Sequence, residues 1–317
     1  MSENLSILIA QTNPKVGDIQ TNKNLILTTI SEFRDCDLIV FSELMLTGYP
    51  PEDLVLKSAF QKEVNKAANE IAIATKSKNC EVLFGVPWQE DGQLFNAAVI
   101  ASDGEITFKH FKNALPNYGV FDEKRVFKSG SDFNSYKLKG KSLGIFICED
   151  VWVDETHHRL PKDKIDIAIS LNASPYEINK LKQREQLASR FSQSIQAPLI
   201  YVNQVGGQDE LVFDGNSFII DRDKVLYQAK HFVEEYKKIE ISASNEIIVN
   251  DNKPKETDHS DEVYSALILG LRDYVNKNKF PGVVVGISGG IDSAFSICVA
   301  VDALGSDKVK GLSLIHI

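Results

Sequence analysis

Short apolar segments alternate along the chain with longer stretches in which apolar residues recur every three to four positions. Asp103-Gly104 separates two short segments and predicts a hairpin turn, because glycine tolerates a positive φ. The longer stretches predict helices over Asn22–Phe33, Ala59–Lys76 and Asn179–Gln196. The short segments predict strands over Leu5–Ala10, Leu38–Phe41, Val82–Val86, Ala97–Ala101, Ile106–Phe108, Leu143–Ile147, Ile165–Leu171, Leu199–Asn203, Ser217–Ile220 and Val225–Tyr227.

This alternation favours an α/β fold in layers. The hairpin indicates a mixed sheet, and so many strands before residue 250 fit two sheets flanked by helices. In the third helix, Leu187, Phe191 and Ile195 follow each other at four-residue spacing and predict one buried stripe.

The pattern changes at Ser242–Glu262, which is polar, largely acidic and contains a proline, so it predicts a linker. A helix is expected next, with Val263, Leu267, Leu271 and Tyr274 on one apolar face. The segment Pro281–Gly305 then predicts a strand, a glycine loop and a helix, and a last short apolar run follows over residues 309–317.

The composition excludes some classes of partner. The 317 residues carry a net charge of −9 and a pI of about 5.3, which argues against nonspecific nucleic-acid binding and against binding to anionic membranes. No apolar run reaches the roughly 18 residues of a membrane helix, and the N-terminus lacks the basic start of a signal peptide. We therefore expect a cytoplasmic protein whose four cysteines, with no C-x-x-C pair, are free thiols.

Three reactive side chains each follow a predicted strand. They are Glu43, Lys112 and Cys148, and ligands of α/β folds gather at the carboxyl ends of strands. Acids at 149 and 150 oppose formation of a thiolate at Cys148, so a cation is needed nearby. Lys112 can supply that charge, and Glu43 can take the thiol proton and later activate water. Taken singly, Glu43 and Lys112 are better explained as solvated charges and Cys148 as a buried thiol, and the residues around them change that balance.

The segments "SELMLTGYPPEDL", "KNALPNYGVFDEKRVF", "ICEDVW" and "LNASPY" together resemble the glutaminase domain of glutamine-dependent NAD+ synthetases, in the nitrilase or carbon–nitrogen hydrolase superfamily. The resemblance implies a two-sheet α-β-β-α nitrilase-like sandwich. It implies that Glu43 is the general base, Lys112 the stabiliser of the tetrahedral intermediate and Cys148 the nucleophile. Glu123 matches an accessory glutamate, and the positions that match those holding the substrate glutamine are Tyr118, Ser174 and Lys180.

The segment "GISGGIDSA" has the parts of a phosphate cradle, although it lacks the Walker A pattern. Two glycines allow close backbone approach, two serines offer hydroxyls, and a helix begins at the loop. A glycine pair alone would favour a tight strand-to-helix turn. The S-G-G-x-D-S pattern resembles the pyrophosphate loop of N-type ATP pyrophosphatases, which are Rossmann-like. This implies that ATP phosphates are held by Gly286, Ile287, Ser288, Gly289, Gly290, Ile291, Asp292 and Ser293, with Asp292 binding Mg²⁺.

Together the resemblances imply a glutaminase domain over residues 1–245, a linker over 246–260 and an incomplete synthetase domain over 261–317. They imply that glutamine supplies ammonia for an ATP-dependent amidation of deamido-NAD+ by a homo-oligomer. The glutaminase step needs no cofactor. Because the sequence stops soon after Ser293, we expect it to be an N-terminal part of the enzyme. A free-standing nitrilase-type amidase and a noncatalytic subunit on the same fold are the alternatives.

Overall fold

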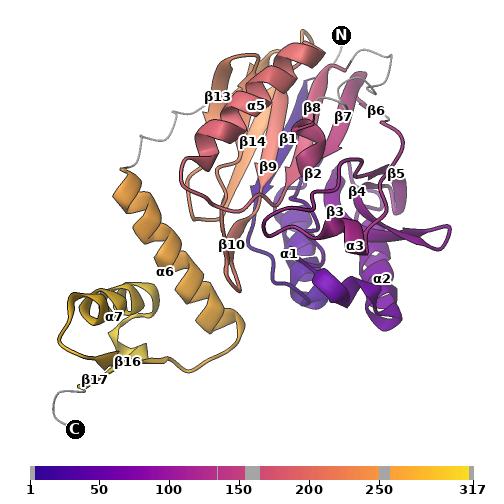
Figure 1. Cartoon of the computed structure of the whole chain (residues 1–317). Helices are drawn as coiled ribbons and strands as arrows, with labels where there is room; N and C mark the ends of the chain where they lie inside the picture. The colour runs from indigo at the N-terminus through magenta and orange to yellow at the C-terminus, as the bar shows by residue number, and fades with distance from the viewer. Residues whose placement is uncertain (1–3, 134, 154–164, 250–257, 314–317) are drawn as a thin grey trace.

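Two β-sheets stacked face to face form the centre of the molecule (Figure 1). The computed structural model describes residues 4–133, 135–153, 165–249 and 258–313. The first sheet has the order β15-β14-β1-β2-β3-β4-β5 and comprises β1 (Leu5–Gln11), β2 (Leu38–Val40), β3 (Glu81–Glu90), β4 (Gln93–Ser102), β5 (Glu105–Phe111), β14 (Glu235–Ile241) and β15 (Ile247–Ile248). The second has the order β13-β12-β9-β8-β7-β6 and comprises β6 (Ser135–Leu138), β7 (Lys141–Ile147), β8 (Ile167–Asn172), β9 (Leu199–Asn203), β12 (Phe218–Asp221) and β13 (Lys224–Gln228).

Helices cover the outer face of each sheet, which gives the expected α-β-β-α order. Helices α1 (Ile19–Glu32) and α2 (Ser58–Ala74) pack on the first sheet, and α5 (Lys180–Ile195) packs on the second. Alternation along the strands explains this packing. In β1, Leu5 and Ile7 face the core between the sheets, whereas Leu8 faces the helices. The central strands are therefore buried on both faces, which is why they appear as continuous apolar runs.

Each predicted strand coincides with an observed one, and the turn at Asp103-Gly104 is confirmed, with both residues at positive φ. Parallel pairs such as β1–β2 and antiparallel pairs such as β1–β14 occur in the same sheet, so the sheets are mixed as expected. The sequence analysis missed β6, β14, β15 and the hairpin of β10 (Val205–Gln208) and β11 (Leu211–Asp214). Glycines interrupt β10, and lysines and glutamates fill the exposed positions of β14, so neither has an apolar run.

The C-terminal region is a β-α-β unit preceded by a long helix (Figure 1). Helix α6 (His259–Lys277) leads to β16 (Val283–Ile287), α7 (Ile291–Leu304), the short η3 (Ser306–Lys308) and β17 (Val309–Ser313). Strands β16 and β17 pair in parallel, and α7 packs on both. None of the helices in the described ranges has the length and apolar composition that crossing a membrane requires. Of the expected linker over 246–260, residues 250–257 lie outside the described residues, residues 247–248 form β15 and residues 259–260 begin α6.

Helix α6 packs against β10 and β11 through a face that the sequence analysis did not select. On the predicted face, Leu267 and Tyr274 are exposed. The buried residues instead include Ala266, Leu269 and Asp273. Glycines allow this arrangement, because a Cβ added to Gly207 would lie 2.9 Å from the Cα of Gly270. Asp273 then anchors the helix by accepting hydrogen bonds from the Gly207 amide and from Asn13.

Candidate active site

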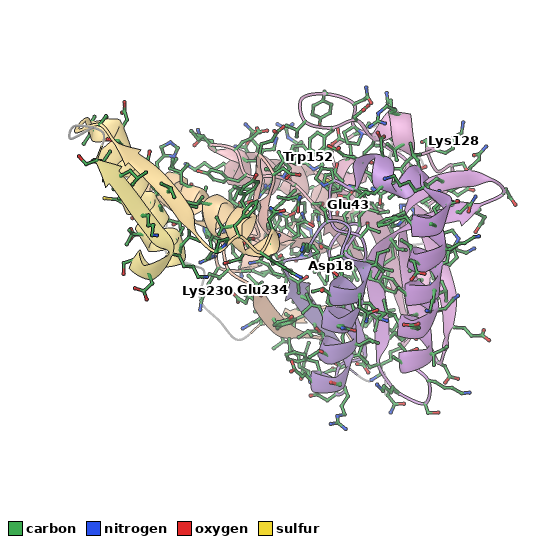
Figure 2. All side chains as sticks on the ribbon, turned by 90° about the horizontal axis from the view of Figure 1, so that it is seen from below. Asp18, Glu43, Lys128, Trp152, Lys230 and Glu234 are labelled. Atoms are coloured by element: carbon green, nitrogen blue, oxygen red, sulfur yellow. The ribbon has the colours of Figure 1, made fainter. Side chains whose placement is uncertain are left out.

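Glu43 and Lys112 meet in the interior of the larger body, as their places at strand ends predicted. Glu43 follows β2, and Lys112 directly follows β5. The Lys112 ammonium donates to Glu43 Oε1 at 2.7 Å and to Glu123 Oε1 at 2.7 Å. All three side chains are buried. Figure 2 labels Glu43 inside this body, with the C-terminal helices extending to one side.

In this cluster the opposite charges counteract the effect of burial on each other's pKa. Burial alone would lower the pKa of Lys112, but the carboxylates of Glu123 and Glu43 hold that pKa well above its usual value. Burial raises the pKa of Glu123, and Lys112 opposes that rise. Lys112 is therefore a permanent cation between two acids, and removing it would leave buried carboxylates without a counter-charge.

Three further groups fix the two acids, and the sequence analysis missed all of them. Asn96 Nδ2 on β4 donates to Glu43 Oε1 at 2.7 Å, and the Ala173 amide donates to Glu43 Oε2 at 3.0 Å. The Tyr49 hydroxyl donates to Glu123 Oε1 at 2.8 Å. Glu43 therefore accepts two hydrogen bonds on Oε1 and one on Oε2. Asn96 sits in the middle of an apolar run, where a lone amide could have signalled a special role.

Cys148 begins the short helix η2 (Cys148–Val151), directly after β7. It is only 6% exposed and adopts a φ of 44°, a conformation that is uncommon for residues other than glycine. Burial and the charge of Glu43 raise the pKa of the Cys148 thiol, and Lys112 opposes the rise. Cys148 thus lies within electrostatic reach of both residues, and its resting form near neutral pH is the protonated thiol.

The acids that follow Cys148 have separate roles. Asp150 is fully buried and clamps two segments together. Its Oδ1 accepts from the amides of Asn113 and Ala114, at 2.9 and 2.8 Å. Its Oδ2 accepts from the Ile147 amide and lies 3.1 Å from His110 Nε2. This carboxylate therefore joins the segment that carries Cys148 to the segment that carries Lys112.

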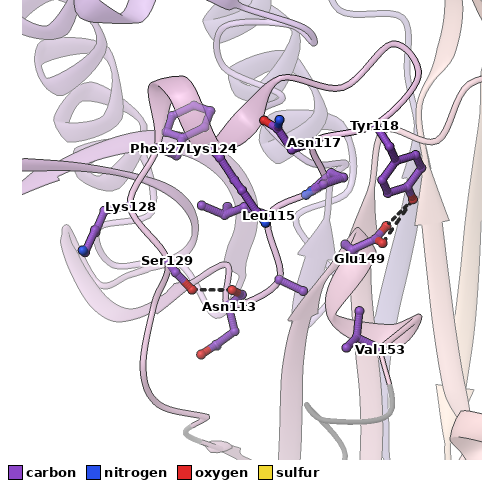
Figure 3. A pocket seen from close by; sticks show the side chains of 12 residues that line it. Asn113, Leu115, Asn117, Tyr118, Lys124, Phe127, Lys128, Ser129, Glu149 and Val153 are labelled. Atoms are coloured by element: carbon purple, nitrogen blue, oxygen red, sulfur yellow. Dashed lines mark hydrogen bonds between the residues drawn. The ribbon is translucent and has the colours of Figure 1, made fainter.

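Glu149 faces a pocket of about 670 Å³ (Figure 3). The Tyr118 hydroxyl lies 3.1 Å from both of its carboxylate oxygens. Burial raises the pKa of Glu149, and the hydrogen bond from Tyr118 opposes the rise. Residues 113–118 line one side of the pocket, and Lys124 and Lys128 lie on another. Tyr118 is therefore connected to the residue beside Cys148, but not directly to the Lys112 cluster.

Ser174 lies just after β8, and Lys180 is the first residue of α5. The Ser174 amide donates to Asn203 Oδ1 at 2.9 Å, and the Ser174 hydroxyl accepts from Arg184 Nε at 3.1 Å. The Lys180 ammonium lies 5.3 Å from the centre of the Trp152 ring and 3.4 Å from Glu177. Lys180 thus does not join the buried cluster. Arg184 was missed, because an arginine in a helix ordinarily indicates a solvated charge.

The glycine loop lies in the C-terminal region, apart from these residues. The Ser293 hydroxyl accepts from the Ser288 amide at 3.3 Å and donates to the Gly290 carbonyl at 2.9 Å. Gly289 has a φ of 87°, and α7 begins directly after Gly290. Residues 288–292 are exposed, and Ser293 is partly buried. No group of three His, Cys, Asp or Glu side chains in the described ranges could hold a metal, so Asp292 would need phosphate oxygens to complete a Mg²⁺ site.

Two family models match the chain. The carbon–nitrogen hydrolase model matches residues 7–245, and the NAD synthase model matches residues 263–317. The glutamine-dependent NAD(+) synthetase of Acinetobacter baylyi is 38% identical over 98% of this chain and 58% of its own length. The corresponding protein of Aquifex aeolicus is 37% identical over 97% of this chain and 60% of its own length. The chain thus spans less than two thirds of the curated relatives it matches.

Solved structures agree with these matches. A glutamine-dependent NAD+ synthetase from Acinetobacter baumannii, solved in complex with ADP, superposes with a TM-score of 0.92 at 37% identity, over 98% of this chain and 59% of that one. An amidase from Nesterenkonia sp. superposes with a TM-score of 0.66 at 19% identity, over 74% of this chain, and shares the fold of the two-sheet body. Because the family model matches residues 7–245, which form the two-sheet body, the chain belongs to the carbon–nitrogen hydrolase family.

Proposed function

We propose that this chain carries the glutamine-hydrolysing half of a glutamine-dependent NAD+ synthetase. The observation that carries the proposal is the buried Lys112 ammonium, held at 2.7 Å by both Glu43 and Glu123 beside the Cys148 thiol. Hydrolysis of an amide through a thioester needs a nucleophile, a group that moves its proton and a cation at the oxyanion. Cys148 supplies the nucleophile, Glu43 moves the proton, and Lys112 supplies the cation.

In the first step the Cys148 sulfur attacks the carboxamide carbon of glutamine while Glu43 accepts the thiol proton. Glu43 Oε2 is the better acceptor, because Oε1 already accepts two hydrogen bonds and Oε2 only one. Lys112 commits two of its three N–H groups to carboxylates, and the third stabilises the oxyanion. Glu43 then passes the proton to the departing ammonia, which leaves a thioester.

In the second step a water molecule loses a proton to Glu43 and attacks the thioester carbon. The tetrahedral intermediate collapses, glutamate leaves, and the sulfur recovers the proton from Glu43. The sum is glutamine plus water giving glutamate plus ammonia, with no cofactor. Tyr118, Ser174 and Lys180 are proposed to hold the glutamine, and Glu123 to hold Lys112 in place.

For the rest of the protein we propose ATP-dependent amidation of deamido-NAD+, which makes the enzyme a carbon–nitrogen ligase. ATP supplies activation of a carboxylate. Gly286–Ser293 would hold its phosphates, and Asp292 a Mg²⁺ ion shared with them. The proposed division is a glutaminase domain over residues 1–245, a linker over 246–260 and part of the synthetase domain over 261–317. A cytoplasmic homo-oligomer is the proposed form.

Ammonia release from different amides tests the glutaminase proposal. We expect release from glutamine at least ten times faster than release from asparagine, acetamide or propionamide at the same concentration. Faster release from a simple amide would favour a free-standing amidase. Release from none of them, with the protein folded, would favour a noncatalytic subunit.

Supplying ammonia directly tests the synthetase half by itself, because it bypasses glutamine hydrolysis. A polypeptide of these 317 residues should form no NAD+ from deamido-NAD+, ATP and ammonia, since its glycine loop is open to solvent and has little around it. A longer protein that includes the full synthetase region is the matched control. NAD+ formation by the 317-residue polypeptide would contradict this assignment of the two halves.

A further inference from the structure

Arg184 is a buried charged side chain outside the Lys112 cluster, and hydrogen bonds use every one of its donors. It lies in the second turn of α5 and is 1% exposed. Arginine has five N–H donors and no acceptor. Nη1 donates to both carboxylate oxygens of Asp214, at 2.8 and 2.9 Å. Nη2 donates to the carbonyls of Ser174 and Pro175, each at 2.8 Å, and Nε donates to Ser174 Oγ at 3.1 Å. All five donors are thus used.

Three of these five bonds reach one short segment, Ser174–Pro175. The residue before it, Ala173, donates its amide to Glu43 Oε2. Asn203 holds the same segment from the opposite side, accepting from the Ser174 amide and donating to the Ser174 carbonyl at 3.2 Å. The backbone that follows β8 is therefore fixed between an arginine and an asparagine.

The polarity of the bond to Ser174 Oγ decides what this hydroxyl can do. Because Arg184 can only donate, the Ser174 oxygen is the acceptor in this pair, and its own hydrogen is turned elsewhere. The Ser174 hydroxyl therefore keeps its hydrogen for an acceptor other than Arg184.

We propose that Arg184 is a positioning residue that holds Ser174 as a hydrogen-bond donor toward an acceptor group of the bound substrate. This inference rests on the proposed glutamine hydrolysis, in which Ser174 contacts the substrate. Asp214 holds Arg184 in turn, and it is itself bonded to Asn216 at 2.7 Å. The effect of losing Arg184 should therefore appear mainly in substrate binding.

The test is steady-state glutamine hydrolysis by Arg184→Lys. Lysine keeps the charge but has three donors on one nitrogen, so it cannot reach Asp214 and Ser174–Pro175 together. We expect KM for glutamine to rise about 10- to 100-fold, the range for one hydrogen bond to a charged or buried group, with a smaller fall in kcat. Arg190→Lys, on the exposed face of the same helix, is the matched control and should leave both constants unchanged.

A double-mutant cycle separates positioning from general damage. Ser174→Ala should raise KM by itself, and Arg184→Lys should add little in the Ser174→Ala background if it acts through that hydroxyl. If Arg184→Lys does not fold, Asp214→Asn replaces it, because this change weakens the grip on Arg184 without removing it, and KM should again rise. An unchanged KM in the folded variant overturns the inference, as does full additivity with Ser174→Ala. Failure of the unaltered protein to hydrolyse glutamine would instead overturn the proposed function.

Discussion

The Lys112 cluster and the glycine loop are both polar sites at the ends of strands, but they are built in opposite ways. Lys112, Glu43 and Glu123 are buried and bond to one another and to Asn96, Tyr49 and Ala173. The loop Ser288–Ser293 lies at the surface, and the side chains of Ser288 and Ser293 form hydrogen bonds within the loop. The Lys112 cluster is therefore fully assembled in the folded protein. The loop Ser288–Ser293 instead leaves hydrogen-bond donors exposed to solvent.

The difference follows from burial: the cluster holds charged groups away from water, whereas the loop is exposed. A buried charge must have its partners in the folded protein, because no water can replace them. An exposed backbone loop at a helix start leaves its amides open to solvent, where a phosphate could accept hydrogen bonds from them. Substitutions in the cluster should therefore affect stability and chemistry together, while those in the loop should affect neither until a nucleotide is present.

The largest effect is expected from Cys148→Ala, which removes the proposed nucleophile. Glutamine hydrolysis should fall by at least about 1000-fold, while the fold persists because a small residue replaces a small one. Ammonia release and circular dichroism measure the two outcomes. Cys298→Ala, in the exposed face of α7, is the control and should retain nearly full activity. Substantial activity in the Cys148 variant would show that the nucleophile is another residue.

Lys112→Met should be the most destabilising single change. It leaves the carboxylates of Glu43 and Glu123 buried without a cation, and losing one partner of a buried pair costs about 3–5 kcal/mol of unfolding free energy. Lys109→Met is the matched control, since Lys109 pairs with Glu90 at the surface and should lose less than about 1 kcal/mol. Urea denaturation compares the two. Equal losses of unfolding free energy in the two variants would mean that burial does not determine how much each lysine contributes to stability.

Asp150→Asn should have an intermediate effect. In the unaltered protein, backbone amides donate to both carboxylate oxygens of Asp150. Asparagine has one acceptor oxygen, and its NH₂ group would face some of these amide donors. About 1–3 kcal/mol of unfolding free energy should therefore be lost. Glutamine hydrolysis should fall as well, because the segments of Cys148 and Lys112 lose their link. Asp132→Asn, an exposed acid bonded to Ser131, serves as control. A stable but inactive Asp150 variant would assign Asp150 a direct part in the chemistry.

The smallest effect is expected in the loop. Ser293→Ala removes weak hydrogen bonds at an exposed site, and the unfolding free energy without nucleotide should change by no more than about 0.5 kcal/mol. Thermal unfolding measures the change. A loss comparable to that of Asp150→Asn would show that the loop is held by more than its own bonds.

The sequence was sufficient for the apolar strands of the two sheets and for the ends of those strands, because apolar runs and strand-end residues are local signals. Leu143–Ile147 predicts β7, and the position of Cys148 follows from it. The family motifs brought Glu123 into the site, although it lies 11 residues beyond Lys112 along the chain.

Residues that act through distant partners could not be predicted. Arg184 lies on a helix whose apolar stripe was recognised, but its burial depends on Asp214, 30 residues away. Asn96 contacts Glu43 across 53 residues. The buried face of α6 was missed for the same reason, since only the close approach of Gly207 to Gly270 makes Asp273 an interior residue.

The protonated resting state of Cys148 has a consequence for covalent probes. Alkylating reagents react with thiolates, so general thiol reagents should modify Cys148 slowly, even in excess. An electrophile that carries a carboxamide would occupy the place of the substrate and let Glu43 remove the proton during attack. Selective labelling of this enzyme in a mixture of proteins would then depend on shape and proton transfer rather than on an acidic thiol.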